Sequence, residues 1–168
     1  MINVVLFEPE IPQNTGNIMR TCVATNCTLH LIEPLGFKLD ENKIRRSGMD
    51  YRKDLNMIVY PNFDDFLSKN QGKYYFITRY GHNPPSDANF NIEENIYLIF
   101  GKESTGVPKE LLQKFPNNLY RLPMVKSARS LNLSNCVAIC VYEVLRQRNY
   151  DDLSREEFIK GSDWVTKE

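Results

Sequence analysis

Residues 98–108 read LIFGKESTGVP and contain the succession of local structures from which an α/β fold is built. The leading residues belong to the apolar run 96–100, which is typical of a strand buried on both faces. Two glycines enclose a short polar loop, and Pro108 suits the first position of a helix. Such a loop follows the carboxyl end of a strand, where α/β sheets bind ligands. Because two glycines are also found in ordinary loops, the stretch is a candidate site only.

Short apolar runs and helical patterns alternate along the rest of the chain. We predict strands over 4–7, 29–32, 57–60, 74–78, 96–100 and 119–122, and helices over 16–25, 41–46, after Asn62 as N-cap, from Pro108, and over 133–147. This alternation indicates an α/β fold with a mostly parallel sheet flanked by helices. We expect one domain over residues 1–150, followed by a C-terminal helix or loosely packed tail over 151–168.

A second candidate site is residues 14–20, NTGNIMR, which follow the first strand and the turn-prone Pro9 and Pro12. Asn14 and Thr15 can cap a helix, and free N–H groups at a helix start suit a phosphate. Arg20 would lie about one turn into that helix. The same pattern is equally typical of a capped helix with a surface arginine.

A third candidate site is residues 122–135, LPMVKSARSLNLSN, where another strand ends and the long helix begins. Ser130, Asn132 and Ser134 crowd the start of that helix, although one N-cap would suffice for its structure. The surplus of donors and acceptors favours a bound polar ligand, while surface serines and asparagines are also common.

Composition limits the class of protein. The 168 residues are 42% hydrophobic and 25% charged, as in a soluble globular domain. We expect a cytoplasmic protein without a membrane segment, because no apolar run approaches the roughly 18 residues that a span needs and the start is too acidic for a signal peptide. The 21 basic and 21 acidic residues cancel, so a nucleic acid would need local basic clusters or a second subunit.

The four cysteines favour core positions over a metal site. Cys22, Cys27, Cys136 and Cys140 include no C-x-x-C pair, and the two histidines, His30 and His82, stand apart from them. Zinc ligands usually come in closer sets. We therefore expect no metal.

In this order and spacing, residues 14–20, 98–106 and 122–134 resemble the three signature motifs of the SPOUT RNA methyltransferases. The resemblance extends from residue 1 to about residue 150. Residues 8–12, 32–37, 45–51 and 141–143 resemble the compact type that methylates the wobble ribose of tRNA. Such proteins consist of little more than the catalytic domain, in agreement with this length.

The resemblance implies a trefoil knot at the C-terminal end of the sheet, which general folding rules would not predict. It implies a homodimer whose active site takes residues from both subunits, with S-adenosylmethionine as cofactor. The cofactor-binding residues that it implies are Thr78, Gly101, Glu103, Leu122, Ser130 and Asn132. Glu103 could hold its loop or face the sulfonium, and the residues alone leave both roles open.

The reaction implied is 2′-O-methylation of the wobble nucleotide, a cytidine or modified uridine, with a leucine tRNA as the expected substrate. Arg20 is the expected catalytic residue, and Asn14 and Asn17 would orient it or the ribose. Since an arginine stays protonated in nearly any protein site, we expect Arg20 to clamp an RNA phosphate and stabilise the developing oxyanion.

Basic and aromatic side chains that could meet the RNA are Arg45, Arg46, Arg129 and Tyr142. The alternative for the arginines is a solvated charged surface, and Tyr142 would look identical as a core or dimer-contact aromatic. Alternatives for the whole chain are a ribosomal RNA 2′-O-methyltransferase of the same class and a non-catalytic RNA-binding module. A Rossmann oxidoreductase is disfavoured, because no G-x-G-x-x-G turn follows the first strand.

Overall fold

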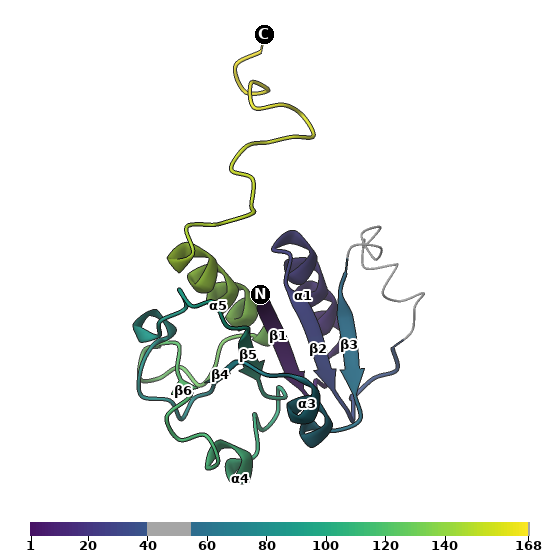
Figure 1. Cartoon of the computed structure of the whole chain (residues 1–168), viewed down its shortest axis with the longest axis vertical. Helices are drawn as coiled ribbons and strands as arrows, with labels where there is room; N and C mark the ends of the chain where they lie inside the picture. Colours follow the sequence, from purple (N-terminus) through teal and green to yellow (C-terminus); the bar gives the residue numbers. More distant parts are fainter. Residues whose placement is uncertain (40–54, 168) are drawn as a thin grey trace.

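The computed structural model describes residues 1–39 and 55–167. In this part of the chain, six strands form one sheet in the order β3-β2-β1-β5-β4-β6, and every pair of neighbours is parallel (Figure 1). The strands are β1 (Ile2–Phe7), β2 (Thr28–Ile32), β3 (Met57–Tyr60), β4 (Lys73–Ile77), β5 (Ile96–Phe100) and β6 (Leu119–Tyr120). The helices are α1 (Pro12–Ala24), α3 (Phe63–Lys69), the 3-10 turn η2 (Pro85–Asp87), α4 (Lys109–Leu112) and α5 (Leu133–Gln147).

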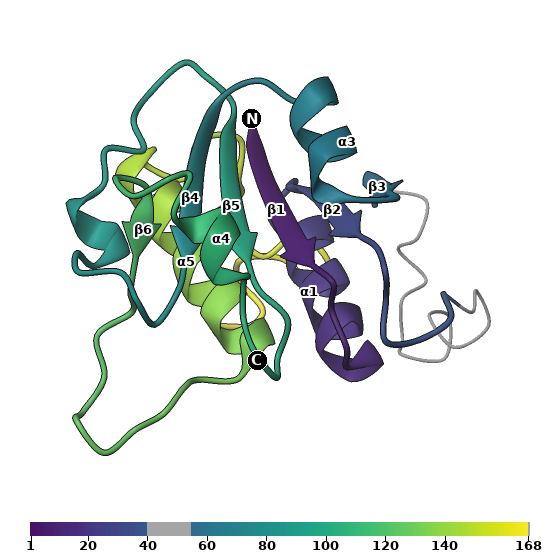
Figure 2. The same cartoon turned by 90° about the horizontal axis from the view of Figure 1, so that it is seen from below.

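Two apolar layers cover the sheet because its central strands are buried on both faces. Val4 and Leu6 point into a core shared with α1 and α5, whereas Val5 and Phe7 point into a second core shared with α3 and α4. Figure 2 shows α1 and α5 on one side of the sheet and α3 on the other. This arrangement confirms the predicted α/β fold with a parallel sheet flanked by helices.

Several element boundaries agree with the sequence prediction, although Pro108, predicted as the first residue of a helix, is instead the N-cap of α4. The strands at 57–60 and 96–100 and the helix at 133–147 match residue for residue. Asn62 caps α3, since its side chain accepts a hydrogen bond of 2.8 Å from the backbone N–H of Asp65. The strand predicted over 119–122 is shorter, because the N–H of Arg121 already bonds to the carbonyl of Asn83 in a loop. The helix predicted over 41–46 lies outside the described residues.

The start of α1 differs from the prediction. We expected a helix from residue 16 with Asn14 or Thr15 as its cap, but α1 begins at Pro12, and Ile11 at the N-cap position offers no side-chain hydrogen bond. Asn14 and Thr15 therefore lie buried inside the helix. Pro12 at the first helical position explains the early start, because its ring fixes a helical φ and its missing N–H needs no partner.

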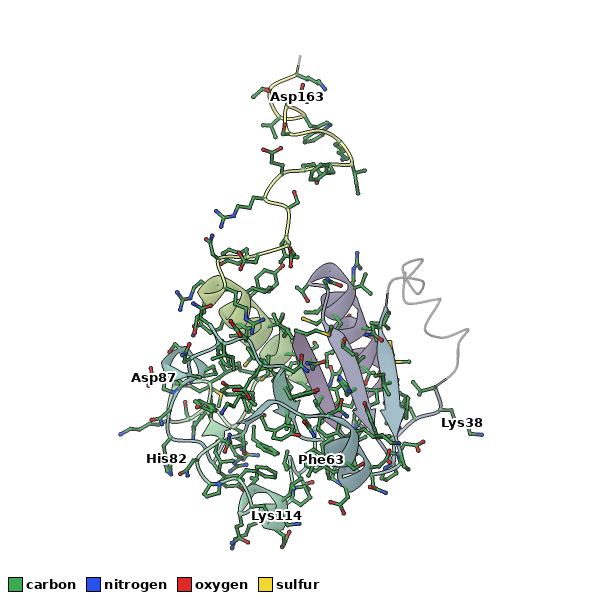
Figure 3. The ribbon with its side chains drawn as sticks, viewed as in Figure 1. Lys38, Phe63, His82, Asp87, Lys114 and Asp163 are labelled. Carbon is green, nitrogen blue, oxygen red and sulfur yellow. The ribbon has the colours of Figure 1, made fainter. Side chains whose placement is uncertain are left out.

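Residues 151–167 contain turns and neither helix nor strand. They continue from the end of α5 away from the sheet (Figure 1). In Figure 3, Asp163 of this tail lies far from Phe63 and His82 of the domain. In the described residues, no helix combines the length and the hydrophobicity that a bilayer span requires.

Candidate active site

The carboxyl ends of β4, β5 and β6 open onto a cavity of about 820 Å³. This volume lies within the range of small-molecule and cofactor sites. Segments that are distant in sequence line the cavity: the start of α1, the loops after β4 and β5, and the loop between β6 and α5. Among the lining residues are Ile11, Asn14, Ile77, Thr78, Arg79, Tyr80, Phe100, Gly101, Lys102, Glu103, Arg121, Leu122, Met124, Arg129, Ser130, Asn132, Leu133 and Cys136.

Glu103 joins the loop after β5 to the start of α1. Its carboxylate accepts hydrogen bonds from the backbone N–H of Glu10 at 2.8 Å, the backbone N–H of Ile11 at 3.3 Å and the Asn14 side-chain amide at 3.0 Å. A helix start has backbone N–H groups without intrahelical partners and a partial positive charge, so a carboxylate there is stabilising. Glu103 thus satisfies groups at the start of α1, a task that local side chains usually perform.

Two further contacts join the same pair of loops, with carboxylates of the loop after β1 accepting from the loop after β5. The Glu10 carboxylate accepts from the backbone N–H and the hydroxyl of Ser104, and these bonds lower the pKa of Glu10. Lys102 forms an ion pair of 2.7 Å with Glu8, and the hydrogen bond to that carboxylate raises the pKa of Lys102. The loops after β1 and β5 therefore form one cross-linked unit.

Asn14 extends this unit to the third loop. Its side-chain oxygen accepts a hydrogen bond of 2.9 Å from the Asn132 amide. Asn132 is the N-cap of α5 and accepts from the backbone N–H of Ser134 at 2.9 Å and from the Ser134 hydroxyl at 2.6 Å. A continuous chain of hydrogen bonds, Glu103–Asn14–Asn132–Ser134, consequently connects the three sequence motifs.

Steric crowding and backbone conformation explain why glycines stand at positions 101 and 106 of the loop after β5. Lys102 and Gly106 form an antiparallel bridge, and a Cβ added at Gly101 would lie 2.2 Å from the carbonyl carbon of Gly106. Gly106 itself adopts a φ of +76°, which L-residues with side chains rarely take. The loop can therefore fold back tightly on itself and bring its backbone to the edge of the cavity.

The structure brings most of the predicted site residues together. Those that line the cavity are Asn14, Thr78, Gly101, Glu103, Leu122, Arg129, Ser130 and Asn132. Asn17, Arg20 and Tyr142 are exposed and lie outside the cavity lining of this single chain. Arg45 and Arg46 lie outside the described residues.

The position of Arg20 follows from the early start of α1. We predicted Arg20 one turn into the helix, but it is the ninth residue of α1, more than two turns from Pro12. Asn14 is buried at the cavity, whereas Arg20 belongs to the exposed face of the same helix. Sequence reasoning placed this arginine near the helix start because it expected the helix to begin later.

Sequence reasoning missed the loop after β4 as a source of charged and aromatic lining residues. Arg79 and Tyr80 line the cavity directly after Thr78, and Arg121 lines it after β6. An available signal for Arg79 and Tyr80 was their place just beyond the carboxyl end of the strand predicted over 74–78, whereas Arg121 fell inside the strand predicted over 119–122. Apolar walls from Ile77, Phe100 and Leu133 alternate in this cavity with backbone groups and arginines, a set that suits a heterocyclic base carrying polar substituents. Within the described residues, no three His, Cys, Asp or Glu side chains are grouped as metal ligands.

The family model of the SpoU rRNA methylases matches residues 1–142. The chain belongs to this family of RNA methyltransferases. A relative in Saccharophagus degradans is 42% identical over 156 residues, covering 89% of this chain and 97% of that protein, and is named tRNA (cytidine(34)-2'-O)-methyltransferase. A Bacillus subtilis relative carries the same name as a provisional assignment; it is 47% identical over 154 residues, covering 90% of this chain and 96% of that protein.

Solved structures share the fold. A structure described as giving insight into the 2-OH methylation of C/U34 on tRNA superposes with a TM-score of 0.81 at 38% identity, covering 89% of this chain and 97% of that one. An rRNA methyltransferase from Sinorhizobium meliloti, solved with AdoMet bound, has a TM-score of 0.76 at 23% identity and covers 86% of this chain and 56% of its own. At that identity the second structure supports the fold alone.

Proposed function

We propose that this chain is an S-adenosylmethionine-dependent methyltransferase that modifies the ribose 2′-oxygen of nucleotide 34, a cytidine or uridine, in a tRNA. The observation that carries the proposal is the hydrogen-bond chain Glu103–Asn14–Asn132–Ser134, which unites three distant motifs around one cavity. The names of near full-length relatives support the choice of tRNA over ribosomal RNA. The catalytic domain comprises residues 1–150, and we expect it in the cytoplasm. The trefoil knot stays a prediction.

When bound, S-adenosylmethionine supplies a methyl group that its sulfonium already activates. Thr78, Gly101, Leu122 and Ser130 would hold the cofactor, chiefly through backbone groups at the strand ends. Glu103 and Asn132 would fix the shape of that site rather than touch the reacting atoms, since hydrogen bonds within the protein already engage their side chains. Of the two roles that the sequence left open for Glu103, holding its loop and facing the sulfonium, we therefore propose the first.

The chemical step forms a C–O bond from the ribose 2′-oxygen to the methyl carbon while the S–C bond breaks. The 2′-hydroxyl proton passes to a phosphate oxygen or to water, because a guanidinium group has no site that accepts a proton. Arg20 would instead bind a phosphate of the RNA and stabilise the negative charge that develops on the 2′-oxygen.

A homodimer would supply Arg20 from a second subunit. Arg20 lies outside the cavity of its own chain, which agrees with a site shared between two copies. The outer face of α5 carries Ile139 and Tyr142, which are 47% and 50% exposed. Because α5 packs against α1, these apolar side chains offer a contact surface for a second copy beside the helix that carries Arg20.

Labelled cofactor, total tRNA from a strain lacking the enzyme and nucleoside mapping test the reaction directly. Label at the ribose of nucleotide 34 supports the proposal; label only in ribosomal RNA, or none in any RNA, contradicts it. For Arg20→Ala we expect a single-turnover rate at least ~100-fold lower, as for removal of one oxyanion-stabilising donor, with cofactor affinity unchanged. Equal losses in both measurements would contradict the catalytic role.

Mixed dimers test whether Arg20 acts across the subunit interface. Arg20→Ala subunits keep an intact cofactor site, and Gly101→Ala subunits keep Arg20. At a cofactor concentration that fills the intact site but not the Gly101→Ala site, dimers that combine the two variants regain one complete site and about half of the wild-type activity per dimer if the sites are shared. No recovery in verified mixed dimers would show that Arg20 serves its own subunit.

A further inference from the structure

The loop after β4, residues 78–83, is held rigidly against β6. The backbone N–H of Thr78 donates to the Tyr120 carbonyl at 2.8 Å, and the N–H of Arg121 donates to the Asn83 carbonyl at 2.9 Å. Between these anchors, Gly81 packs so closely that an added Cβ would lie 2.4 Å from the carbonyl carbon of Tyr120. Both ends of the loop and its centre are therefore fixed on the strand.

This rigid loop presents an aromatic ring at the mouth of the cavity. The Tyr80 side chain is 59% exposed although it lines the cavity together with Thr78 and Leu122. The Arg79 guanidinium lies 5.5 Å from the centre of the Tyr80 ring, within cation–π range. Arg121 donates from its side chain to the Arg79 carbonyl at 3.0 Å, which ties both arginines to the same loop. The backbone that carries this ring is anchored at both ends of the loop, the Arg79 guanidinium lies beside the ring, and Tyr80 is left 59% exposed.

The charge around Tyr80 is positive despite the zero net charge of the chain. The acidic side chain that lines the cavity is Glu103, and its oxygens already accept hydrogen bonds from the start of α1. Lys102 is paired with Glu8, which leaves Arg79, Arg121 and Arg129 as the cations of the cavity lining. Within residues 1–39 and 55–167, no carboxylate oxygen lies within 4.0 Å of these three guanidinium groups. The mouth of the cavity therefore attracts anions.

We propose that Tyr80 is a stacking platform for an unpaired base of the substrate RNA adjoining the methylated nucleotide, and that Arg79 and Arg121 bind phosphates of the same strand. The inference rests on the proposed function and deepens it. Proteins recognise single-stranded RNA loops by stacking splayed bases on exposed aromatic rings beside basic groups. A ring on a backbone that is already anchored suits this role, because the loop loses little freedom on binding. The adjoining position follows from Tyr80 lying at the mouth of the cavity that would hold the methyl donor.

Substitutions at Tyr80 test the platform with a readout that separates RNA from cofactor. We expect Tyr80→Ala to weaken binding of an anticodon stem-loop RNA by roughly tenfold, the lower end of base–aromatic stacking, and to raise the KM for that RNA. Cofactor affinity by titration stays at the wild-type value, and Tyr80→Phe, which keeps the ring, binds RNA like wild type. Phe158→Ala is the matched control, because it removes an aromatic residue that is 80% exposed and belongs to the tail over 151–167.

For Arg79→Gln and Arg121→Gln we expect a shallower dependence of RNA affinity on salt, by about 0.7 in the log–log slope for each lost phosphate contact. Wild-type RNA affinity in Tyr80→Ala overturns the platform. If Tyr80→Ala lowers cofactor affinity as much as RNA affinity, the platform is also overturned and Tyr80 belongs to the methyl-donor site. If Tyr80→Phe binds RNA as weakly as Tyr80→Ala, the Tyr80 hydroxyl makes a hydrogen bond to the RNA and stacking is not the main contact.

The same experiment separates this inference from the proposed function. If the wild-type chain binds the stem-loop but transfers no methyl group to it, the proposed reaction is wrong while the comparison of RNA affinities still decides the role of Tyr80. If the wild-type chain transfers the methyl group and Tyr80→Ala is indistinguishable from it, only the platform fails. Failure of the wild-type chain to bind the stem-loop overturns both.

Discussion

Replacing Glu103 with alanine removes the carboxylate that binds the start of α1 from another loop. Three donors lose their acceptor: the backbone N–H groups of Glu10 and Ile11 and the side-chain amide of Asn14. The loss affects stability first, because none of these bonds involves a reacting atom.

The expected magnitude follows from the exposure of these groups. Loss of a helix cap costs about 1 kcal/mol, and loss of a negative charge from a helix N-terminus costs roughly 0.3–1 kcal/mol. The part-buried amide of Asn14 loses a further bond to a charged acceptor, which water replaces only in part. We therefore expect a loss of about 2 kcal/mol for Glu103→Ala and about 1 kcal/mol for Glu103→Gln, which keeps one acceptor. For a chain of this size, the larger value lowers Tm by about 4–8 °C.

Thermal unfolding at fixed protein concentration measures this effect, since a dimer's Tm depends on concentration. Single-turnover methylation at saturating cofactor measures the chemical step in the same variants. We expect Glu103→Ala to melt earlier and, below its Tm, to react at nearly the wild-type rate once cofactor is saturating. An unchanged Tm combined with a rate at least ~100-fold lower would refute the structural role of Glu103. That result would mean that the Glu103 carboxylate stabilises the reacting sulfonium.

Two further predictions concern the loop glycine and a buried histidine. For Gly101→Ala we expect at least ~10-fold weaker cofactor binding by titration, because a Cβ 2.2 Å from Gly106 backbone atoms forces the loop open; wild-type affinity would show that the loop yields. Burial lowers the pKa of His30 from 6.5 to about 4, so the unfolded chain takes up a proton between these values while the folded chain resists it. The free energy of unfolding should therefore fall by about 2 kcal/mol from pH 7 to pH 5 through His30 alone. Urea titrations at both pH values, with His30→Gln as control, check this, and an equal fall in the control would contradict it.

The sequence predicted the sheet well because burial on both faces leaves a direct imprint on a parallel strand. The run at 96–100 is buried throughout and ends where the structure ends it. The run at 57–60 was bounded correctly by its apolar composition, although Ile58 and Val59 of this edge strand are exposed. The helix over 133–147 begins directly after the Asn132 cap. Local chemistry also identified Asn62, whose cap lies three residues from its partner. Features that depend on near neighbours were therefore within reach of the sequence.

Pro12 was a local signal for the start of α1, but the acceptor that binds this start was out of reach because it comes from a distant part of the chain. Glu103 reaches the N–H groups of residues 10 and 11 only after β1 and β5 have paired, and no local rule anticipates this. All six predicted cofactor residues line one cavity because they follow neighbouring parallel strands. Tyr80 was overlooked because, in the sequence, an aromatic residue after a strand is indistinguishable from a core residue until its exposure is known.

The pairing of β1 with β5 has a consequence for synthesis of the protein. In the finished sheet, Val4 lies beside Leu98, so the N-terminal strand cannot complete its hydrogen bonds until nearly a hundred residues have left the ribosome. Until then the nascent chain can assemble at most the β3-β2-β1 half, with one apolar strand edge unpaired. Such an edge invites aggregation, which makes the interval before β5 emerges the step at which a chaperone would protect this chain.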